Sequence, residues 1–194
     1  MAHSIRRTSP LLILAVLWLT ACNRAATSET GTVTQASSTP AAQTTTASAG
    51  EAQVAQHLTT FDDLDYNVFS NQKWDELSRS HHKDILVHWP DGHTTKGIEK
   101  HIEDLKALFV HAPDTRIKEH PIKFGSGEWT AVTGIMEGTF TRPMQGPDGK
   151  SIQPTGKAFR LPMCTIGRWE NGVMVEEFLY WDNATYMNQM GLGQ

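Results

Sequence analysis

The sequence has 194 residues, 39% hydrophobic and 20% charged, with a formal net charge of -4. This length suits one ordinary domain with some additional chain. Arg6, Arg7, Arg24 and Glu29 are the only charged residues before position 51, which leaves 14 of the 17 basic and 20 of the 21 acidic residues in the remainder. That acidic balance excludes nucleic acid as an expected partner, because binding to a phosphate backbone requires clustered Lys and Arg.

The N-terminus predicts an export signal. Arg6 and Arg7 precede nine apolar residues at 11–19, a stretch too short to span roughly 30 Å of hydrocarbon as a helix. A charged start followed by a short apolar run is typical of a signal peptide. The next residues, Leu19-Thr20-Ala21-Cys22, are similar to a bacterial lipobox. That similarity implies removal of residues 1–21 and a lipid on Cys22; the alternative is a plain secretory signal with an incidental cysteine.

Lipidation of Cys22 would place the mature chain outside the cytoplasm. Asn23 stands where an Asp favours retention in the inner membrane, so an outer-membrane position on the periplasmic face is expected if the host is Gram-negative. Cys164 is then the one remaining thiol, which excludes an internal disulfide. Of positions 23–50, 19 of 28 are Ala, Ser or Thr, so residues 22–52 are predicted to form a flexible tether.

Residues 53–194 are predicted to form one folded domain. Apolar residues at helical spacing predict three helices, which cover residues 52–69, a short segment capped by Asn71 and residues 98–112. Alternation with period two predicts strands, which cover residues 85–89, 115–124, 129–141, 157–169 and 173–181. Asn171-Gly172 predicts a hairpin turn, and a last short helix through Met190 is expected after Asp182 or Asn183. Helices segregated to one face of a curved antiparallel sheet make an α+β domain with a cone-shaped cavity for a small molecule.

Two stretches of this domain carry a family resemblance. The first is His88-Trp89-Pro90-Asp91-Gly92. The second is Glu176-Glu177-Phe178-Leu179-Tyr180-Trp181-Asp182, followed by Met187, Gln189, Met190, Gly191 and Leu192. On these residues the domain resembles the SnoaL-like polyketide cyclases, also called the ester cyclase group, which have the nuclear-transport-factor-like cone fold. The resemblance covers about residues 53–192.

The resemblance also implies a set of site residues. In the family, an Asp at the position of Asp182 removes a proton alpha to a carbonyl, without cofactor or metal, so Asp182 is expected to be the catalytic base. Apart from the resemblance, His88 and Tyr180 are expected to be orienting groups, with His88 counted among the catalytic residues. Strand alternation places Asp182 and Tyr180 on one face of their strand. The residues expected to contact the substrate are Tyr180, Phe178, Trp89, Arg160 and Glu176.

Several of these residues have a second interpretation. Asp182 at a junction between a strand and a helix is also a typical helix N-cap. His88 also fits a hydrogen-bonded wall or core position, and His81-His82 are expected to be solvated. The spacing of His88, His93 and His101 matches no ligand pattern, so no metal is expected.

The sequence therefore predicts an exported lipoprotein that carries out cofactor-independent acid–base chemistry on a small hydrophobic carbonyl compound. The reaction classes are those of an ester or polyketide cyclase, an isomerase or a lyase. The alternative is a non-catalytic module that binds a small molecule at the cell envelope. The expected partners are that small molecule, the membrane through the lipid anchor and, from the family, a second copy in a homodimer.

Overall fold

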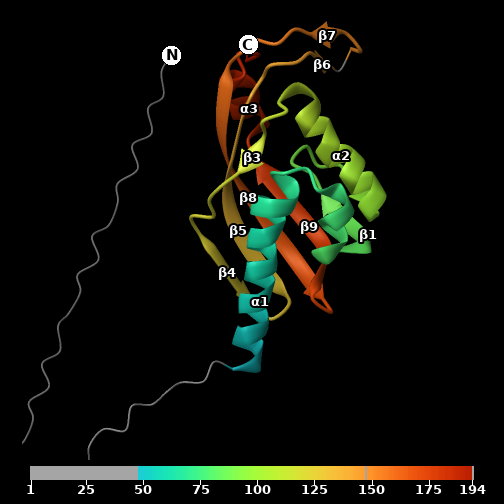
Figure 1. The fold of residues 1–194 in the computed structure, drawn as a ribbon, viewed down its shortest axis with the longest axis vertical. Coiled ribbons are helices and arrows are strands. Elements are labelled where there is room, and N and C mark those ends of the chain that lie inside the picture. Colours follow the sequence, from blue (N-terminus) through green and yellow to red (C-terminus); the bar gives the residue numbers. More distant parts are fainter. Residues whose placement is uncertain (1–47, 147, 194) are drawn as a thin grey trace, which may run out of the picture. The chain divides into compact units, whose positions relative to one another are not determined.

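A computed structural model of the protein describes residues 48–146 and 148–193 (Figure 1). The signal peptide, Cys22 and the tether up to position 47 lie outside the described residues. All the elements below belong to the unit Thr44–Gln194. None of the helices in the described ranges is long and apolar enough to cross a membrane.

The first helical segment is longer than predicted at its start. Helix α1 (Ala49–Asp63) continues into a π-helical segment, η1 (Leu64–Phe69). Ser48 and Glu51 form a capping box, in which Ser48 N–H donates to the Glu51 carboxylate at 2.6 Å and Glu51 N–H donates to Ser48 Oγ at 3.3 Å. The capping box fixes the beginning of the helix, so the last residues assigned to the tether are helical.

The second predicted helix is a short 3₁₀ helix, η2 (Trp74–Arg79), and Asn71 does not cap it. The Asn71 amide instead donates to backbone oxygens of Tyr66 and Asn67, at 3.1 and 3.0 Å. Asn71 therefore satisfies carbonyl groups at the end of η1. Helix α2 (Ile98–His111) confirms the third predicted helix.

The main sheet has seven strands in the order β2-β1-β9-β8-β5-β3, with β4 also paired to β5. Their bounds are β1 (His81–His88), β2 (Thr94–Lys96), β3 (Arg116–Ile117), β4 (Lys123–Ser126), β5 (Trp129–Thr139), β8 (Ala158–Glu170) and β9 (Val173–Trp181). Strands β6 (Met144–Gln145) and β7 (Ser151–Ile152) form a separate hairpin. The β1–β9 pair is parallel, whereas the prediction was antiparallel throughout; the other pairs of the main sheet are antiparallel.

Two predicted strands differ from the observed ones. Residues 115–124 form two short strands, β3 and β4, instead of one. Strand β1 begins at His81, four residues earlier than predicted, and His81 is 2% exposed rather than solvated. The predicted hairpin between β8 and β9 is confirmed, with positive φ angles of 51° at Asn171 and 82° at Gly172.

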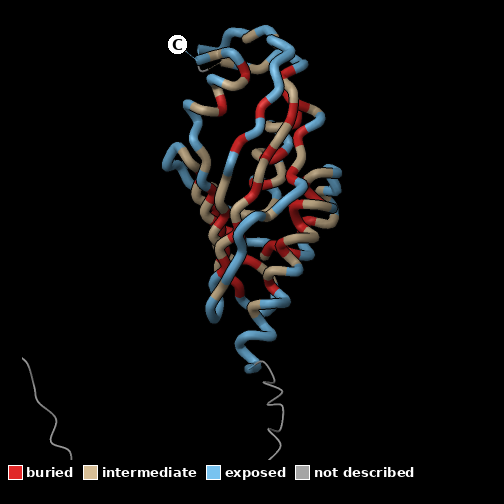
Figure 2. The backbone as a smooth tube through the Cα atoms, turned by 90° about the vertical axis from the view of Figure 1, so that its left-hand side faces the viewer, coloured by how far each residue is buried: buried red, intermediate tan, exposed pale blue. Residues whose placement is uncertain are grey.

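Helices α1 and α2 lie on one face of the curved sheet, and the buried residues gather between them (Figures 1 and 2). On β5, Val132 and Met136 point inward and are buried. On β9, a register shift leaves Val175 as an extra residue between Met174 and Glu176. This bulge changes the alternation, so that Met174, Glu177 and Leu179 all point inward.

The last helix, α3 (Asn183–Gln189), begins at the predicted place with Asp182 as its N-cap. Gln189 attaches it to the sheet: its amide oxygen accepts from Arg160 N–H at 2.6 Å and its amide nitrogen donates to Arg160 O at 3.2 Å. The Gln of the closing sequence pattern thus replaces a missing strand partner beside β8.

Candidate functional site

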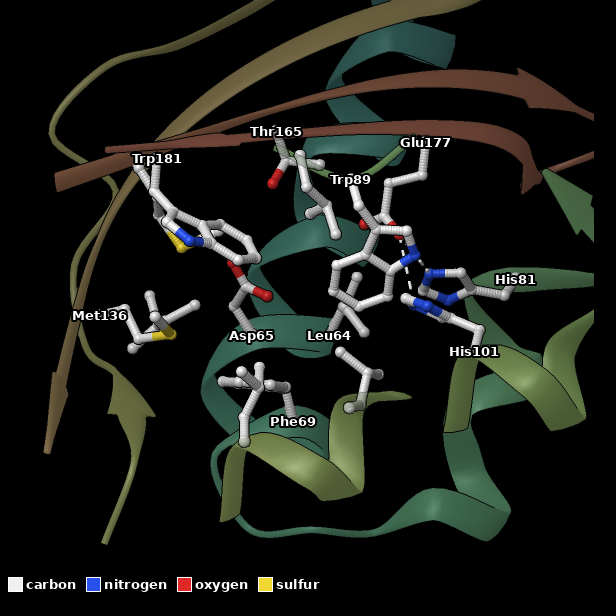
Figure 3. A pocket seen from close by; sticks show the side chains of 15 residues that line it. Leu64, Asp65, Phe69, His81, Trp89, His101, Met136, Thr165, Glu177 and Trp181 are labelled. Atoms are coloured by element: carbon white, nitrogen blue, oxygen red, sulfur yellow. Dashed lines mark ion pairs between the residues drawn. The ribbon is translucent and has the colours of Figure 1, made fainter. Parts of the chain in front are cut away.

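A small cavity lies between the helices and the inner face of the sheet (Figure 3). Its free volume of about 40 Å³ accommodates a few water molecules, each of which needs at least roughly 10–15 Å³. Its lining is mostly apolar, from Leu64, Phe69, Trp89, Leu105, Leu108, Ile117, Met136, Met163, Leu179 and Trp181. The polar lining residues are Asp65, His81, His101, Thr165 and Glu177. These five form the candidate site.

The Asp65 side chain extends from η1 into the cavity, and its carboxylate contacts His120. His120 Nε2 lies 2.8 Å from Asp65 Oδ2, and His120 Nδ1 lies 2.8 Å from Asp62 Oδ1. Lys123 also donates to Asp62. The imidazole is 1% exposed and stacks on Tyr66, with ring centroids 4.6 Å apart. A histidine between two carboxylates fixes the orientation of both and binds a proton strongly.

The pKa values of the two aspartates shift in opposite directions. Burial raises the pKa of Asp65, and the hydrogen bond from His120 offsets only part of that effect. For Asp62, burial is outweighed by hydrogen bonds from Lys123 and His120, so its pKa is lowered. Burial lowers the pKa of His120, but the contacts with Asp65 and Asp62 outweigh it and the net pKa is raised. Asp65 is thus the more basic carboxylate and the one that lines the cavity.

A second polar cluster in the same cavity consists of His81, His101 and Glu177, from β1, α2 and β9. Glu177 Oε2 lies 3.2 Å from His101 Nε2 and 3.7 Å from His81 Nε2 (Figure 3). The side chains of all three are 6% exposed or less. Burial lowers the pKa of His101 to about 4. For Glu177, burial is outweighed by the facing His81 and His101 imidazoles, so its pKa is lowered. Glu177 is therefore the anionic member of the cluster.

Asp182 lies outside this cavity. Its carboxylate accepts from Ala184 N–H at 2.9 Å and from the Thr185 hydroxyl at 2.7 Å, at the start of α3. The hydrogen bonds from Thr185 and Ala184 lower the pKa of Asp182, and the side chain is exposed. Asp182 is therefore a helix N-cap. Its environment lowers its basicity, whereas a catalytic base needs a raised one.

The other residues expected beside Asp182 also lie on the outer face of β9. His88 stacks on Phe178 with ring centroids 4.1 Å apart, and His88 Nε2 lies 3.0 Å from Glu176 Oε1. Arg168 donates to the other Glu176 oxygen at 3.1 Å. Tyr180 is 50% exposed. The expectation that this face of β9 lines the cavity is corrected, because the inner face is that of Glu177.

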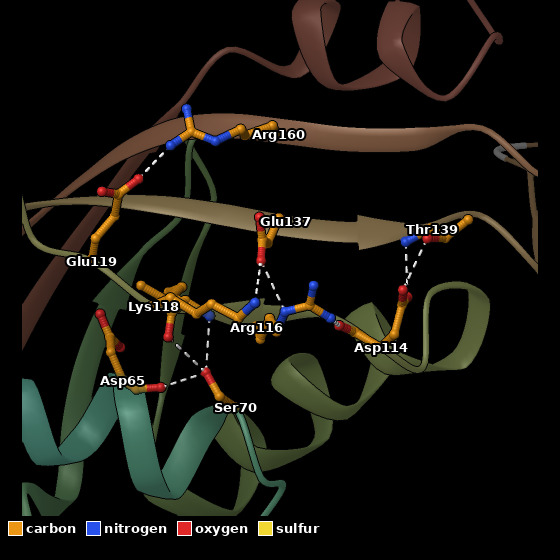
Figure 4. Close-up of polar contacts among 10 residues, drawn as sticks. Asp65, Ser70, Asp114, Arg116, Lys118, Glu119, Glu137, Thr139 and Arg160 are labelled. Atoms are coloured by element: carbon orange, nitrogen blue, oxygen red, sulfur yellow. Dashed lines mark hydrogen bonds and ion pairs between the residues drawn. The ribbon is translucent and has the colours of Figure 1, made fainter.

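Of the predicted substrate-contacting residues, Trp89 lines the cavity and Arg160 does not. Arg160 is exposed on β8 and donates to Glu119 (Figure 4). It borders a surface depression together with Arg116 and Glu137. Trp181 and Met163 line both the cavity and an outer depression that includes Asp182. These two side chains separate the interior from the surface.

None of the five polar residues of the site was among the predicted site residues. Asp65 carries a signal, because it lies between Leu64 and Val68 on the apolar side of a helix, where an acidic residue is unexpected. Glu177 carries a weaker one, since an adjacent acidic pair on a strand places one member inside. His81 carries none, because its burial depends on where β1 begins.

Comparison with known proteins agrees with this architecture. The sequence model of the SnoaL-like polyketide cyclase family matches residues 60–190, more than half of the chain. No curated protein sequence matches the chain.

Solved structures of the same fold are similar to this chain at low identity. A candidate SnoaL-like polyketide cyclase from Jannaschia sp. CCS1 is 17% identical with a TM-score of 0.64, over 73% of this chain and 95% of that one. IdmH, a candidate polyketide cyclase from Streptomyces antibioticus, is 22% identical with a TM-score of 0.61, over 70% and 99%. A candidate polyketide cyclase from Xanthomonas campestris pv. campestris is 13% identical with a TM-score of 0.61, over 71% and 98%. These structures support the fold, and the family match supplies the assignment: the chain belongs to the SnoaL-like polyketide cyclase family.

Proposed function

We propose that the protein is an acid–base enzyme of cyclase or isomerase type that acts on a small hydrophobic carbonyl compound, with Asp65 as the group that moves the proton. The observation that carries this proposal is the environment of Asp65. Its carboxyl lies in a mostly apolar cavity, burial raises its pKa, and His120 holds one of its oxygens at 2.8 Å. A general base works best when its pKa lies near the working pH, and desolvation is the usual way to raise the pKa of a carboxylate to that range.

The proposed step is a proton transfer at carbon. Asp65 accepts a proton from the carbon alpha to the substrate carbonyl, and the electron pair of the broken C–H bond passes into the enolate. The same carboxylic acid then returns the proton to carbon; alternatively, the enolate carbon closes a ring onto a second carbonyl, and the alkoxide formed from that carbonyl takes up the proton from Asp65. His120 and Asp62 keep the Asp65 carboxyl oriented during both transfers. The proposed hydrogen-bond donor to the enolate oxygen is the hydroxyl of Thr165, which lines the cavity and is 3% exposed.

Substrate entry requires a side-chain movement in this proposal. The free volume of about 40 Å³ is well below the roughly 300–1,000 Å³ of ordinary ligand pockets. Trp181 and Met163 separate the cavity from the outer depression. Their displacement would join the two spaces and admit a larger carbonyl compound.

The test is hydrogen–deuterium exchange, which reports the proton transfer without requiring the natural product. The purified protein is incubated in D₂O with a panel of small ketones and β-keto esters, and deuterium at the alpha carbon is measured by mass spectrometry. We expect exchange above the uncatalysed rate for at least one compound. Asp65→Asn should lower it by at least about 100-fold, because a positioned general base contributes about 10²–10⁴-fold.

Asp182→Asn is the matched control for this test. It removes a carboxylate of the same type outside the cavity and should leave exchange unchanged. Loss of exchange in Asp182→Asn together with full activity in Asp65→Asn would overturn the assignment of the base.

The second candidate function is binding without catalysis, which the mostly apolar lining of the cavity favours. A binding module would bind carbonyl compounds without exchange, with equal affinity in the wild type and in Asp65→Asn. Calorimetric titration of the same panel separates these two functions.

We also propose that the protein acts outside the cytoplasm, anchored through a lipid on Cys22. This proposal is supported by the N-terminal sequence, which is similar to a signal peptide, and by the residues at 19–22, which are similar to a lipobox. In the native host, radiolabelled palmitate should be incorporated into the wild type, and the protein should fractionate with membranes. Cys22→Ser should abolish the labelling; unchanged labelling would contradict the proposal.

A further inference from the structure

We propose that His81, His101 and Glu177 bind one divalent transition-metal ion, with Zn²⁺ as the representative ion. The inference goes beyond the proposed proton transfer and does not depend on it, since it concerns the second polar cluster of the cavity. Three features support it: the spacing of the ligand atoms, the hydrogen bond at the distal nitrogen of His81 and the burial of the unpartnered atoms.

The spacing of the three ligand atoms suits such an ion. In tetrahedral sites, Zn²⁺ lies about 2.0–2.2 Å from nitrogen and oxygen ligands, which places neighbouring ligand atoms roughly 3.3 Å apart. Glu177 Oε2 lies 3.2 Å from His101 Nε2 and 3.7 Å from His81 Nε2. One ligand atom from each of the three residues lies within 4.8 Å of the other two. Movement of the three ligand atoms to these separations would complete the coordination.

The hydrogen bonds of His81 leave its Nε2 free to bind a metal. Ser80 Oγ donates its proton to Leu77 O at 3.2 Å, so it accepts from His81 Nδ1 at 2.9 Å. A neutral imidazole with its proton on Nδ1 presents a lone pair at Nε2. That lone pair faces the Glu177 carboxylate, which is also an acceptor. A hydrogen bond that orients the distal nitrogen is typical of histidines that bind metals.

Burial makes this arrangement costly without a cation. Among the described residues, neither His81 Nε2 nor Glu177 Oε2 has a hydrogen-bond partner, and both atoms are inaccessible to solvent. Buried acceptors that face one another without a donor destabilise the fold. A divalent cation between the three atoms would satisfy all of them at once. A single proton shared by His81 and Glu177 would satisfy those two residues, but it would not bridge the contact between Glu177 and His101.

Two histidines and one carboxylate form a donor set that occurs in catalytic zinc sites, where a fourth position stays open. In this protein all three residues line the cavity, so an open position would face the same space as Asp65. The ligands come from three different elements, β1, α2 and β9. The carbonyl oxygen of a substrate or a water molecule is the expected fourth ligand.

The direct test uses the wild-type protein after removal of metals with a chelator. Titration with Zn²⁺ against a chromophoric chelator should give a stoichiometry of one ion per chain. Co²⁺ should bind at the same site and produce a visible absorption band that Zn²⁺ abolishes. X-ray absorption at the zinc edge should show only nitrogen and oxygen ligands. Absence of stoichiometric binding, or a sulfur ligand, would overturn the proposal whatever the variants do.

Two substitutions assign the site to these residues. Glu177→Gln and His101→Gln should each weaken Zn²⁺ binding by more than the roughly 10–100-fold typical of changes outside the first coordination shell. Glu176→Gln is the matched control, because Glu176 is the neighbouring residue on β9, contacts a histidine of its own and faces outward. Equal zinc affinity in all three variants would place the ion at a surface histidine and contradict the proposal.

Discussion

At the scale of single residues, the molecule contains two aspartates with opposite environments. Asp65 lies in a mostly apolar cavity, where burial favours its protonated form and raises its pKa. Asp182 is exposed and accepts hydrogen bonds that favour its charged form, so its pKa is lowered. Desolvation of its charged form raises the basicity of a carboxylate, whereas hydrogen bonds to the charged form lower it, so the first environment suits proton abstraction from carbon.

The structural role of Asp182 leads to a prediction about stability. Asp182→Ala removes the side-chain acceptor for Ala184 N–H and the contact with Thr185, so the thermal midpoint should fall by a few degrees. Asp182→Asn should keep the wild-type midpoint, because Asn is an equally good N-cap. Scanning calorimetry measures both variants. An equal loss in both would indicate that the charge, rather than the cap, provides the stabilisation.

At the scale of elements, the π-helical segment η1 positions the proposed base. Ser70 N–H donates to Asp65 O at 3.2 Å, five residues back, and Ser70 Oγ lies 2.6 Å from the same oxygen. Ser70 Oγ also accepts from Ile117 N–H of β3 at 2.9 Å (Figure 4). The hydroxyl of Ser70 therefore ties the backbone at Asp65 to the edge of the sheet. Such π-helical turns occur frequently at functional sites.

Ser70→Ala should therefore affect stability and activity together. Loss of the hydroxyl leaves Ile117 N–H without its acceptor, at a cost of about 1–3 kcal/mol in unfolding free energy. It should also lower the alpha-proton exchange rate, because the Asp65 backbone loses its attachment. Denaturant titration and the exchange assay measure the two effects.

Thr59→Ala provides the control for Ser70→Ala. The Thr59 hydroxyl donates to Ala55 O within α1 on an exposed surface, so its removal should change neither stability nor exchange appreciably. If Ser70→Ala resembles this control, the attachment between η1 and β3 does not position Asp65.

At the scale of the whole molecule, buried histidines should govern the stability at acidic pH. Burial lowers the pKa of His57, His101 and His111, in the case of His101 to about 4. Each has a lower pKa in the folded protein than in the unfolded chain, so the unfolded chain binds more protons below about pH 6.5. Their contribution to stability is complete above that pH and is lost as the pH falls.

His120 acts in the opposite direction. Burial lowers its pKa, but the contacts with Asp65 and Asp62 raise it above the unfolded value. The contribution of His120 to the stability of the fold is therefore complete below about pH 6.5, and it is lost as the pH rises through the pKa of His120 in the folded protein. Acidification weakens the contributions of three histidines and preserves that of one, so a net loss of stability on acidification is expected.

The prediction is a thermal midpoint that falls steadily from pH 7 to pH 4.5, measured with EDTA present. His57→Phe should flatten this profile, because it keeps the stacking on Trp169, with centroids 4.7 Å apart, but removes a titrating group. His93→Gln, at an exposed position, should leave the profile unchanged. A midpoint that does not depend on pH in the wild type would show that these histidines do not control stability.

The outer face of the sheet carries exposed aromatic side chains, with Trp129 at 42% and Tyr180 at 50% exposure. The homodimer that the family resemblance implies stays a prediction, and this face is the natural candidate for its interface. Sedimentation of the purified protein measures the association state directly.

Much of the fold was predictable from the sequence. Apolar periodicity predicted α2, and alternation predicted β5 and β9, because these patterns depend only on which side of an element faces water. Asn171-Gly172 predicted the hairpin, because the turn needs positive φ angles. The closing sequence pattern, including Gln189, predicted the family. These features depend on local chemistry that the chain carries in itself.

The tertiary structure alone decided which residues form the site. The bulge at Val175 determines that Glu177 points inward, and the position of Asp182 after β9 makes it a cap. The parallel pairing of β1 with β9 brings His81 Nε2 within 3.7 Å of Glu177 Oε2, although the two residues are far apart in the sequence. Single-residue shifts in register reverse the direction of a side chain, and strand pairing joins distant segments, so neither can be obtained from local sequence patterns.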